Sequence, residues 1–358
     1  MNIGNAIILT EWERSQIYAI ERGFLYMPNI KDIAKAANTS KSTVSRYLNG
    51  YTVKPATAKA IAKAIEELGY HPNANAKGLV LNKTNVIGIV LDNITNNFYA
   101  GMLAGIESIT RKFNYSCVYY SCMSSQKKEN EFLNLIYEGR VDGLILGTFS
   151  VRDIEDVKEL SELKDSIVII GDNADNKDIT SIDIDNEEGI AEMVCYLYSL
   201  GHKRIAYLSG PKDINAAIAR EKGYIQGLRK CGILYDPNLV IKSDWTFEGG
   251  YNAVKEALGK IDFTAIVGSN DYSAYGALRS IQDAGLNVPG DVSVTGFDDI
   301  DIAAFSQPPM TTIRQPFFDV GRRAAMELLD KIDNKAQCYS RIILKPTMIK
   351  RESCRAII

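Results

Sequence analysis

The stretch that decides the fold runs from Asn29 to Asn49 and reads NIKDIAKAANTSKSTVSRYLN. It predicts two short helices separated by a turn at Asn38-Thr39. Asn29 can accept hydrogen bonds from the first free N–H groups of a helix, and Asp32 suits the positive end of the helix dipole. Apolar residues then recur at the three-four spacing of one helix face: Ile30, Ile33, Ala34 and Ala37.

A second helix is predicted to begin after Ser40, which can cap it. Val44 and Leu48 lie four residues apart and face inward. Side chains rich in hydrogen-bond donors then point outward, where they suit phosphates and base edges: Lys41, Ser42, Ser45, Arg46 and Asn49. By itself this pattern also fits an ordinary helical hairpin with a solvated polar face.

The continuation of the chain favours DNA recognition. Lys54-Pro55 opens a third helix, with proline at its first position, and Gly69 ends it. The apolar face of this third helix consists of Ile61, Ile65 and Leu68. Three segments follow in order: Tyr70-His71-Pro72-Asn73, Ala76-Lys77-Gly78-Leu79 and Thr84-Asn85-Val86-Ile87-Gly88. This ordered series resembles the LacI/GalR family of bacterial transcription regulators, and the resemblance runs from about Pro28 to Arg351.

The resemblance implies a mixed α/β protein. An N-terminal all-α helix-turn-helix head and a hinge helix should precede a two-lobed core, like that of periplasmic binding proteins, of parallel sheets flanked by helices. The chain should cross between the lobes three times. The expected ranges are 27–70 for the head, 71–84 for the hinge and 85–358 for the effector-binding and dimerisation core, with lobe 1 at about 85–185 and 316–340, and lobe 2 at about 186–315 plus the C-terminal strand.

Residues 1–26 match nothing in this family and are expected to be a non-native or disordered extension. Ala6-Ile7-Ile8-Leu9 is too short an apolar core for a signal peptide. Our hypothesis is that translation begins at Met27.

The hinge is expected to fold on operator DNA. The resemblance places Leu79 as the side chain that enters the minor groove, with Lys77 where the family usually has arginine. An apolar wedge between base steps unstacks and kinks the duplex, at a cost of roughly a few kcal/mol per step that wider contact offsets. A plain flexible linker would leave Leu79 without a role.

From Val86 onward, short apolar strands alternate with amphipathic helical stretches. The predicted strands are Val86 to Leu91, Ser116 to Ser121, Gly143 to Leu146, Ile167 to Ile170, Ile205 to Leu208, Ala265 to Val267 and Val292 to Thr295. Strands buried on both faces with helical crossovers form parallel sheets, whose ligands bind beyond the carboxyl ends of the strands.

Polar side chains follow several of these strands where each one ends: Asp92, Asp172, Asn270-Asp271 and Asp298-Asp299. Carboxylates and amides at the same end of parallel strands converge on one cleft, and such acceptors suit neighbouring sugar hydroxyls. A single residue of this kind is more often a helix cap, but four in one topological position favour a ligand site.

The resemblance assigns roles around this cleft. Arg220 should clamp the effector with Asp298 opposite, Trp245 should stack on it, and Asp92, Asp172 and Asn270 should be polar contacts, with Phe98 and Tyr99 closing the cleft from the first lobe. A surface ion pair of Arg220 with Glu221 or Asp213, and simple packing of Trp245, are the alternatives. Ile214 and Ala216 replace contacts of purine-responsive members, which argues against a purine.

The charge distribution supports a nucleic-acid partner for the head. Residues 27–84 carry nine Lys or Arg against three Asp or Glu, a net charge of +6, whereas residues 85–358 carry 30 against 38, a net charge of −8. No apolar run approaches membrane-spanning length. Six scattered cysteines without metal-ligand spacing are predicted to be buried, reduced thiols.

The leading hypothesis is a cytoplasmic, nucleoid-associated repressor of a carbohydrate-utilisation operon. It should bind a pseudo-palindromic operator as a homodimer and respond allosterically to a small sugar or sugar phosphate. Lys41, Ser42 and Arg46 should face base edges, and the expected phosphate or positioning contacts are Ser40, Thr43, Ser45 and Asn49. The chain stops soon after Arg351 without heptads, which favours a dimer over a tetramer.

Two alternatives belong to other classes of protein, and a third is a narrower form of the same regulator. An enzyme is disfavoured because the only histidines, His71 and His202, lie beside no plausible nucleophile, and no GxSxG elbow or phosphate-cradling loop occurs. A solute-binding protein would need a signal sequence and no basic head. A catabolite-control-type regulator would take a phosphorylated carrier protein as co-regulator on the first lobe. No cofactor and no metal are expected.

Overall fold

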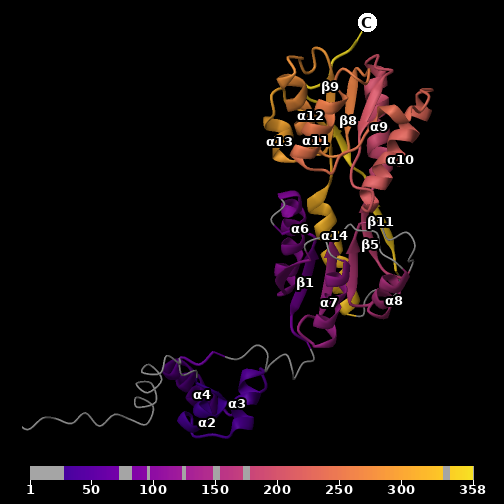
Figure 1. Ribbon diagram of the computed structural model, residues 1–358. Coiled ribbons are helices and arrows are strands. Elements are labelled where there is room, and N and C mark those ends of the chain that lie inside the picture. Colours follow the sequence, from indigo (N-terminus) through magenta and orange to yellow (C-terminus); the bar gives the residue numbers. More distant parts are fainter. Residues whose placement is uncertain are drawn as a thin grey trace, which may run out of the picture. The chain divides into compact units, whose positions relative to one another are not determined.

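The computed structural model describes residues 28–71, 83–94, 97–122, 126–147, 154–171, 178–333 and 339–357. The chain divides into two compact units, Met1–Thr84 and Asn85–Ile358 (Figure 1). The extension 1–26, Lys77, Leu79 and Asp172 lie outside the described residues. What the sequence predicts for them stays a prediction.

Among the described residues of the first unit, three helices are present: α2 (Ile30–Ala36), α3 (Lys41–Leu48) and α4 (Pro55–Leu68). The Asn29 side chain accepts a hydrogen bond from the Lys31 amide at 2.8 Å, and the Asp32 carboxylate accepts one from the Asn29 amide at 2.8 Å. The two bonds form a capping box at the start of α2. The predicted start of the first helix is therefore confirmed.

The other predicted helix ends are also confirmed. Ser40 caps α3 by accepting a hydrogen bond from the Thr43 amide at 3.2 Å, and Gly69 ends α4 with a φ of 58°. The three helices pack on one small core, whose buried members are Ile33, Ala34, Ala37, Val44, Ile61, Ala64 and Tyr70. Burying this face leaves the opposite side of α3 in solvent.

The second unit contains two six-stranded sheets. The first has the order β11 (Arg341–Leu344), β5 (Ser181–Ile184), β4 (Ile167–Ile170), β3 (Gly143–Gly147), β1 (Val86–Leu91) and β2 (Ser116–Ser121), and all its strands are parallel. Helices α6 (Ala100–Thr110) and α14 (Phe317–Ile332) cover one face, and α7 (Gln126–Tyr137) and α8 (Ile154–Glu162) cover the other. The short helices η1 (Asn97–Tyr99) and η2 (Arg111–Phe113) flank α6.

The second sheet has the order β12 (Thr347–Ile349), β10 (Thr311–Arg314), β9 (Ser293–Asp298), β8 (Ala265–Gly268), β6 (Ile205–Leu208) and β7 (Val240–Ile241). Only β12 is antiparallel to its neighbour among these paired strands. Helices α9 (Asn186–Ser199) and α10 (Asn215–Lys230) cover one face, and α11 (Phe247–Ala257) and α12 (Asp271–Asp283) the other. Two short elements, η3 (Pro237–Leu239) and α13 (Asp301–Phe305), lie in the connections.

The chain passes between the sheets at three places: between β5 and α9, between β10 and α14, and between β11 and β12. We call the part built on the first sheet lobe 1 and the part built on the second lobe 2. Strand β11 belongs to the first sheet, so lobe 1 extends to Leu344, whereas the sequence places its end at about residue 340. Ile342 to Leu344 are a run of only three apolar residues, and the sequence does not mark this segment as a strand of this sheet.

The cysteines are less buried than the sequence suggests. Cys117, Cys122, Cys195, Cys231 and Cys354 are free thiols, and only Cys122 of these described residues is fully buried. Cys195 and Cys231 lie 3.3 Å apart at Sγ, because α9 and α10 pack closely. None of the helices in the described part of the chain combines the length and apolarity that a membrane crossing requires.

The capping box makes a testable contribution to the stability of the first unit. We expect Asn29→Ala to lower its free energy of unfolding by about 1 kcal/mol, because the first helical N–H groups lose their acceptor. Urea unfolding of the full chain, followed by far-UV circular dichroism, measures this. Lys31→Ala, which keeps the cap, is the control, and equal stability of the two variants would contradict the assignment.

Candidate functional site

A cavity of about 240 Å³ lies between the two lobes of the second unit. Seven of the eight predicted ligand residues line it: Asp92, Phe98, Tyr99, Arg220, Trp245, Asn270 and Asp298. The eighth, Asp172, lies outside the described residues. The side chains meet because the carboxyl ends of both parallel sheets face this cavity. Their roles toward a ligand stay predictions.

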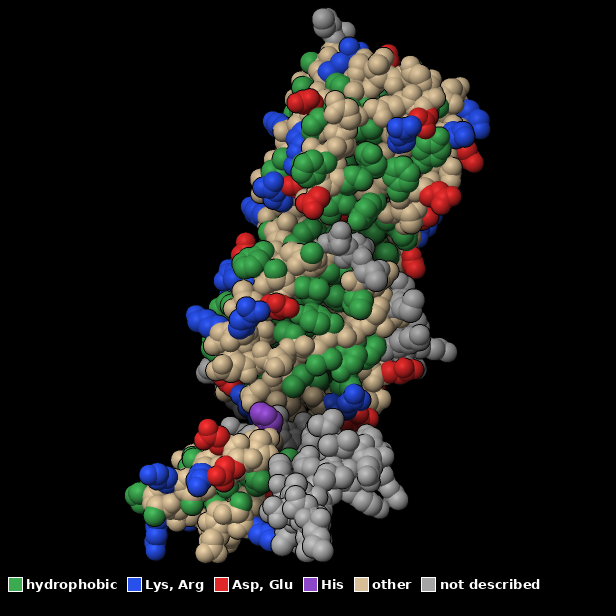
Figure 2. Space-filling view, turned by 90° about the vertical axis from the view of Figure 1, so that its left-hand side faces the viewer, with side chains coloured by type: hydrophobic (Ala, Val, Ile, Leu, Met, Phe, Trp, Pro, Cys, Tyr) green, Lys and Arg blue, Asp and Glu red, His purple; other side chains and the backbone are tan. Residues whose placement is uncertain are grey.

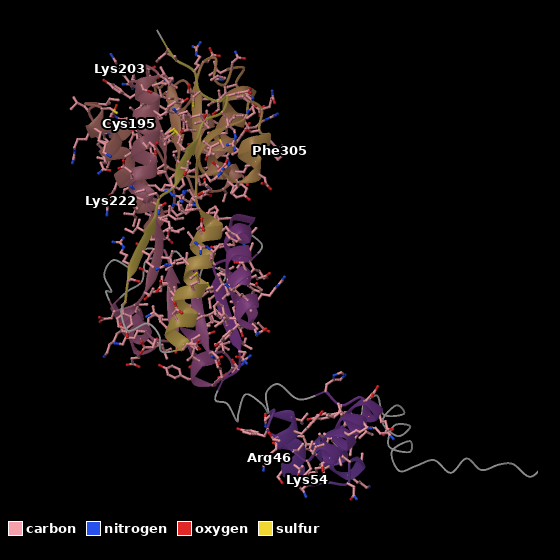
Figure 3. The ribbon with its side chains drawn as sticks, turned by 180° about the vertical axis from the view of Figure 1, so that it is seen from behind. Arg46, Lys54, Cys195, Lys203, Lys222 and Phe305 are labelled. Atoms are coloured by element: carbon pink, nitrogen blue, oxygen red, sulfur yellow. The ribbon has the colours of Figure 1, made fainter. Side chains whose placement is uncertain are left out.

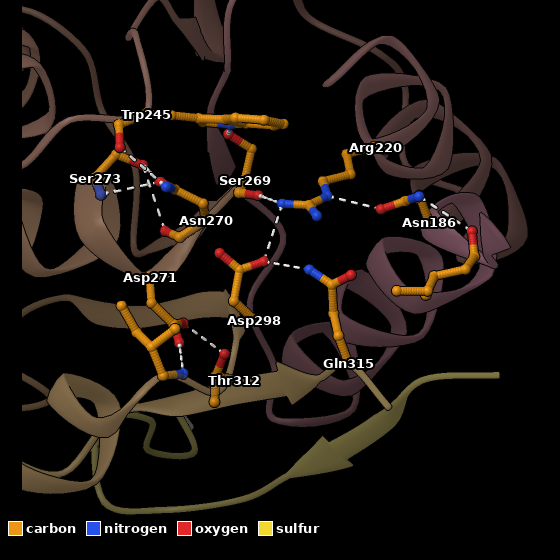
Figure 4. A network of polar contacts seen from close by, with 12 residues as sticks. Asn186, Arg220, Trp245, Ser269, Asn270, Asp271, Ser273, Asp298, Thr312 and Gln315 are labelled. Carbon is orange, nitrogen blue, oxygen red and sulfur yellow. Dashed lines mark hydrogen bonds and ion pairs between the residues drawn. The ribbon is translucent and has the colours of Figure 1, made fainter. Parts of the chain in front are cut away.

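Arg220 is the centre of the polar part of the cavity and is only 3% exposed. Its Nε donates to Asn186 Oδ1 at 2.8 Å and its Nη1 donates to the Ser269 carbonyl at 2.6 Å (Figure 4). Its ion pair is with Asp298, whose Oδ1 lies 3.4 Å from Nη1. No ion pair with Glu221 or Asp213 is found for this described residue, so the surface alternative is wrong.

Two aromatic rings hold the guanidinium in place. Its central carbon lies 3.9 Å from the ring centre of Phe297 and 4.9 Å from that of Trp245. Helix α10 (Asn215–Lys230) begins five residues before Arg220, and so Arg220 projects from its second turn. This rigid position on a helix fixes the direction of the charged group.

Asp298 ends strand β9 with an unusual backbone. Its φ is 121° and that of Asp299 is 57°, both in the left-handed region that favours glycine. Asp299 accepts contacts from Arg314 and Arg351 at 2.6 Å each, and these ion pairs hold the turn. The strained backbone turns the Asp298 carboxylate toward Arg220 and Gln315.

Asp298 accepts a hydrogen bond from Gln315 Nε2 at 2.5 Å on the same oxygen that faces Arg220. Burial raises the pKa of Asp298 to about 6, although Arg220 and Gln315 act in the opposite direction. Asp271 lies behind it and accepts from Thr312 Oγ1 at 2.6 Å and the Ile300 amide at 2.9 Å. Burial, followed by the charge of Asp298, raises the pKa of Asp271 well above its ordinary value.

Asn270 is both a helix cap and a cavity residue. Its Oδ1 accepts from the Ser273 amide at 3.0 Å at the start of α12, and its Nδ2 donates to the Trp245 carbonyl at 3.0 Å. Trp245, with a φ of 68°, donates from Nε1 to Ser269 Oγ at 2.7 Å. The indole is therefore positioned by polar contacts and is not only packed.

Lobe 1 contributes an aromatic wall to the cavity. The ring centres of Phe98 and Tyr99 lie 5.2 Å apart and those of Phe98 and Phe317 lie 4.5 Å apart, all edge to face. Tyr99 donates its hydroxyl to Asp92 at 3.4 Å. Burial, with a smaller effect of Asp92, raises the pKa of Tyr99 far above its ordinary value.

Several polar residues that line the cavity were not predicted as contacts: Asn93, Asp183, Asn186, Asn215, Tyr272 and Gln315. Gln315 directly follows β10, just as the predicted residues follow their strands. Asn186 lies two residues after β5. Both strands include polar residues and lack a continuous apolar run, so the sequence does not predict them as strands whose ends face the cavity.

The predicted DNA-reading residues lie together on α3. Lys41, Ser42 and Arg46 are exposed, and Arg46 is marked in Figure 3. Ser40 Oγ lies 2.8 Å from the hydroxyls of both Ser42 and Thr43. Asn49 Nδ2 donates to Ser45 Oγ at 3.5 Å. These donors therefore lie on the solvent-facing side of a single helix.

A small helical head with an exposed donor surface, followed by a two-lobed ligand-binding core, defines a ligand-responsive regulator of the helix-turn-helix class. Residues 29–73 match the model of the bacterial regulatory proteins of the lacI family, and residues 194–354 match that of the periplasmic binding protein-like domain. The chain belongs to the lacI family of transcriptional regulators.

Catabolite control protein A of Priestia megaterium is 36% identical to this chain over 90% of its length and 97% of the relative. A structure of the lac repressor dimer bound to operator and the anti-inducer ONPF has a TM-score of 0.83 at 27% identity, covering 92% and 100% of the two chains. The transcriptional regulator CelR in complex with cellobiose has a TM-score of 0.70 at 32% identity, covering 91% and 99%. The predicted family and fold class are confirmed.

The position of Trp245 depends on the absence of a side chain at Gly210. A Cβ there would overlap the indole nitrogen, so we expect Gly210→Ala to displace the ring and break its bond to Ser269. In a Trp12→Phe background, the emission of Trp245 should move to longer wavelength as the ring enters water. Lys212→Ala, at a nearby exposed position, is the control; an unchanged spectrum for Gly210→Ala would contradict this packing.

Proposed function

We propose that this chain is a repressor whose affinity for operator DNA is set by a small sugar or sugar phosphate in the cavity between the lobes. The main support is that the buried Arg220–Asp298 pair forms hydrogen bonds with residues at two of the three places where the chain crosses between the lobes. Asn186 contacts Arg220 at the first crossing and Gln315 contacts Asp298 at the second. A ligand on this pair changes contacts at the points about which the lobes turn.

The chemistry of the cavity suits a sugar. An arginine fork donates to neighbouring hydroxyls, a carboxylate accepts from them, and an aromatic face covers the apolar side of the ring. Arg220, Asp298 and Trp245 provide these three groups within one cavity. The related regulator CelR has been solved with cellobiose, which favours the same ligand class here.

On the DNA side, we assign base contacts to Lys41, Ser42 and Arg46. Phosphate or positioning contacts go to Ser40, Thr43, Ser45 and Asn49, and the hinge contacts remain Lys77 and Leu79. The net charge of +6 on residues 27–84 supplies the attraction to phosphate. The related lac repressor has been solved as a dimer bound to its operator, and we base these assigned DNA contacts on that arrangement.

An apolar face supports self-association of the core. In Figure 2, hydrophobic side chains gather on the face of both lobes that carries α6 and α13. Large exposed apolar residues belong to these elements and their neighbours: Phe113, Val118 and Phe318 in lobe 1, and Phe247, Leu286 and Phe305 in lobe 2. A homodimer would remove this surface from water and present two heads to a pseudo-palindromic operator.

The relatives are transcriptional regulators, and we assign no catalysis to this chain. We place it in the cytoplasm with the nucleoid, acting on a carbohydrate-utilisation operon. A second candidate is favoured by the similarity to catabolite control protein A: regulation by a phosphorylated carrier protein docking on lobe 1. Lobe 1 surface variants with an intact cavity would separate the two candidates.

Arg46 provides the test of DNA reading. A pseudo-palindrome should be enriched from a randomised duplex pool by the full chain. Arg46→Ala should weaken binding to it by about 1–3 kcal/mol, because a bidentate base contact is lost. Fluorescence anisotropy with labelled DNA measures this. Lys63→Ala on α4, whose charge is paired with Glu67 at 3.5 Å, should bind almost normally; failure to enrich any symmetric site would refute the proposal.

The raised pKa of Asp298 predicts how effector binding varies with pH. Above about pH 6 the group is a carboxylate that accepts from sugar hydroxyls, and below it the group gains a proton and loses this capacity. Sugar affinity should therefore be constant from pH 7 to 8 and fall by up to about tenfold per unit below pH 6. Calorimetry at several pH values measures it. Asp298→Asn should bind weakly with a flat profile, and an equally steep profile for this variant would refute the assignment.

A further inference from the structure

Two cysteines face each other across the interface between helices α9 and α10, outside the lining of the cavity. We propose that Cys195 and Cys231 form a reversible disulfide by exchange with a low-molecular-weight disulfide such as oxidised glutathione, and that this bond fixes the two helices that carry Asn186 and Arg220. The formation of this disulfide does not depend on the effector or on the proposed DNA contacts.

The two sulfur atoms are close and partly accessible. Cys231 Sγ donates to Cys195 Sγ at 3.3 Å, and a disulfide bond measures about 2 Å, so a small side-chain movement brings them together. Both residues are partly exposed, which gives a small oxidant access while the helices stay folded. Figure 3 shows Cys195 and Phe305 on opposite sides of lobe 2, so the pair lies away from the face proposed for self-association.

The close approach of the two helices places the cysteines opposite each other. A Cβ on Gly227 would lie 2.7 Å from Val194 Cβ and 3.0 Å from Ala191 Cα, so the helices touch at their backbones. Cys195 follows Ala191 by four residues and Cys231 follows Gly227 by four, which is about one helical turn in each case. The sulfur pair is therefore the next contact along the same helix interface.

The hydrogen bond gives the two thiols different roles. Cys231, the C-cap of α10, donates to Cys195, and burial together with this hydrogen bond raises the pKa of Cys231 to about 11. The ammonium group of Lys230 interacts electrostatically with both sulfur atoms. A hydrogen-bond donor and a nearby cation favour a reactive thiolate. Cys195 is therefore the attacking sulfur and Cys231 the resolving one.

The exchange has two steps. Cys195 loses its proton to solvent and its thiolate attacks one sulfur of the oxidant, which breaks the S–S bond of the oxidant, forms a mixed disulfide and releases a thiolate that takes up a proton. Cys231 then loses its proton and attacks the Cys195 sulfur, which forms the bond between the helices and releases the second thiolate, also protonated by solvent. The protein gives up two electrons and two protons, and the oxidant becomes two thiols.

The helix pair connects the cysteines with the cavity. At the cavity end of the interface, Arg220 of α10 donates to Asn186 of α9 at 2.8 Å. One turn further along, a Cβ on Gly223 would overlap the Glu187 carbonyl oxygen, so the helices are in backbone contact there as well. Because this contact continues to the cysteine pair, a covalent bond at the far end opposes any movement that separates Asn186 from Arg220.

Mass spectrometry of the full chain tests the disulfide. The chain is incubated with oxidised glutathione, free thiols are blocked with iodoacetamide, and trypsin is added without reductant. Tryptic peptides 178–203 and 231–242, which carry the two cysteines, should be recovered joined to each other. Excess reduced glutathione before blocking should separate them. The absence of joined peptides would overturn the proposal, as would a bond that reduced glutathione leaves intact.

Single substitutions test the roles of the two sulfur atoms. Cys231→Ser should accumulate a mixed disulfide with glutathione on Cys195, because the resolving thiol is gone. Cys195→Ser should react at Cys231 about tenfold more slowly, since the Cys231 thiol keeps its proton. Cys117→Ser, at a partly exposed thiol of lobe 1, is the control and should form the joined peptides normally. Faster reaction at Cys231 than at Cys195 would overturn the assigned order.

Hydrogen exchange tests the link to the cavity without any effector. The amides of Gly189 and Ile218 form hydrogen bonds of 3.1 Å in the first turns of α9 and α10, at the cavity end. In the oxidised chain they should exchange about threefold or more slowly than in the reduced chain. Cys231→Ser treated in the same way should show no slowing. Slower exchange only near Cys195 and Cys231 would overturn the link to Arg220.

Discussion

The buried ion pair between Arg220 and Asp298 is the constraint on which the site depends. Both side chains are 4% exposed, and moving such charges from water is expensive unless each is paired and hydrogen-bonded. Asn186, the Ser269 carbonyl and Gln315 provide these bonds. The buried pair is therefore stable only while α9, α10, the ends of β8 and β9 and the two crossing segments keep their relative positions.

Holding the carboxylate in this position also requires a strained backbone at the end of β9. Residues held in the left-handed region cost of order 1–3 kcal/mol each and persist only where their surroundings determine them. At Asp298 and Asp299 the surroundings are Arg314, Arg351 and the Ile300 amide bonded to Asp271. A relaxed turn would direct the carboxylate away from Arg220, leaving a buried guanidinium without a counter-charge.

The sequence predicted the fold well wherever apolar periodicity was strong. The head helices were predicted because Asn29, Ser40 and Gly69 mark their ends by local chemistry. Strands β5 and β10 were missed because tertiary pairing, and not an apolar run, makes them strands, and β11 was missed because its apolar run has only three residues. Asn186 and Gln315 were missed with them, and a contact to another side chain, such as that of Gln315 to Asp298, has no local signature.

The same bonds explain how binding can be coupled to the arrangement of the lobes. In the arrangement described, Arg220 and Asp298 are already satisfied by protein groups, so a ligand adds little unless it replaces or extends those bonds. A ligand that replaces the hydrogen bond of Arg220 to Asn186, or that of Gln315 to Asp298, leaves a residue at a crossing without its partner. The arrangement of the lobes in which that residue finds a new hydrogen-bond partner is then favoured. A ligand shifts an equilibrium only by its difference in affinity for the two states. This difference arises at the groups that the cavity shares with the crossings.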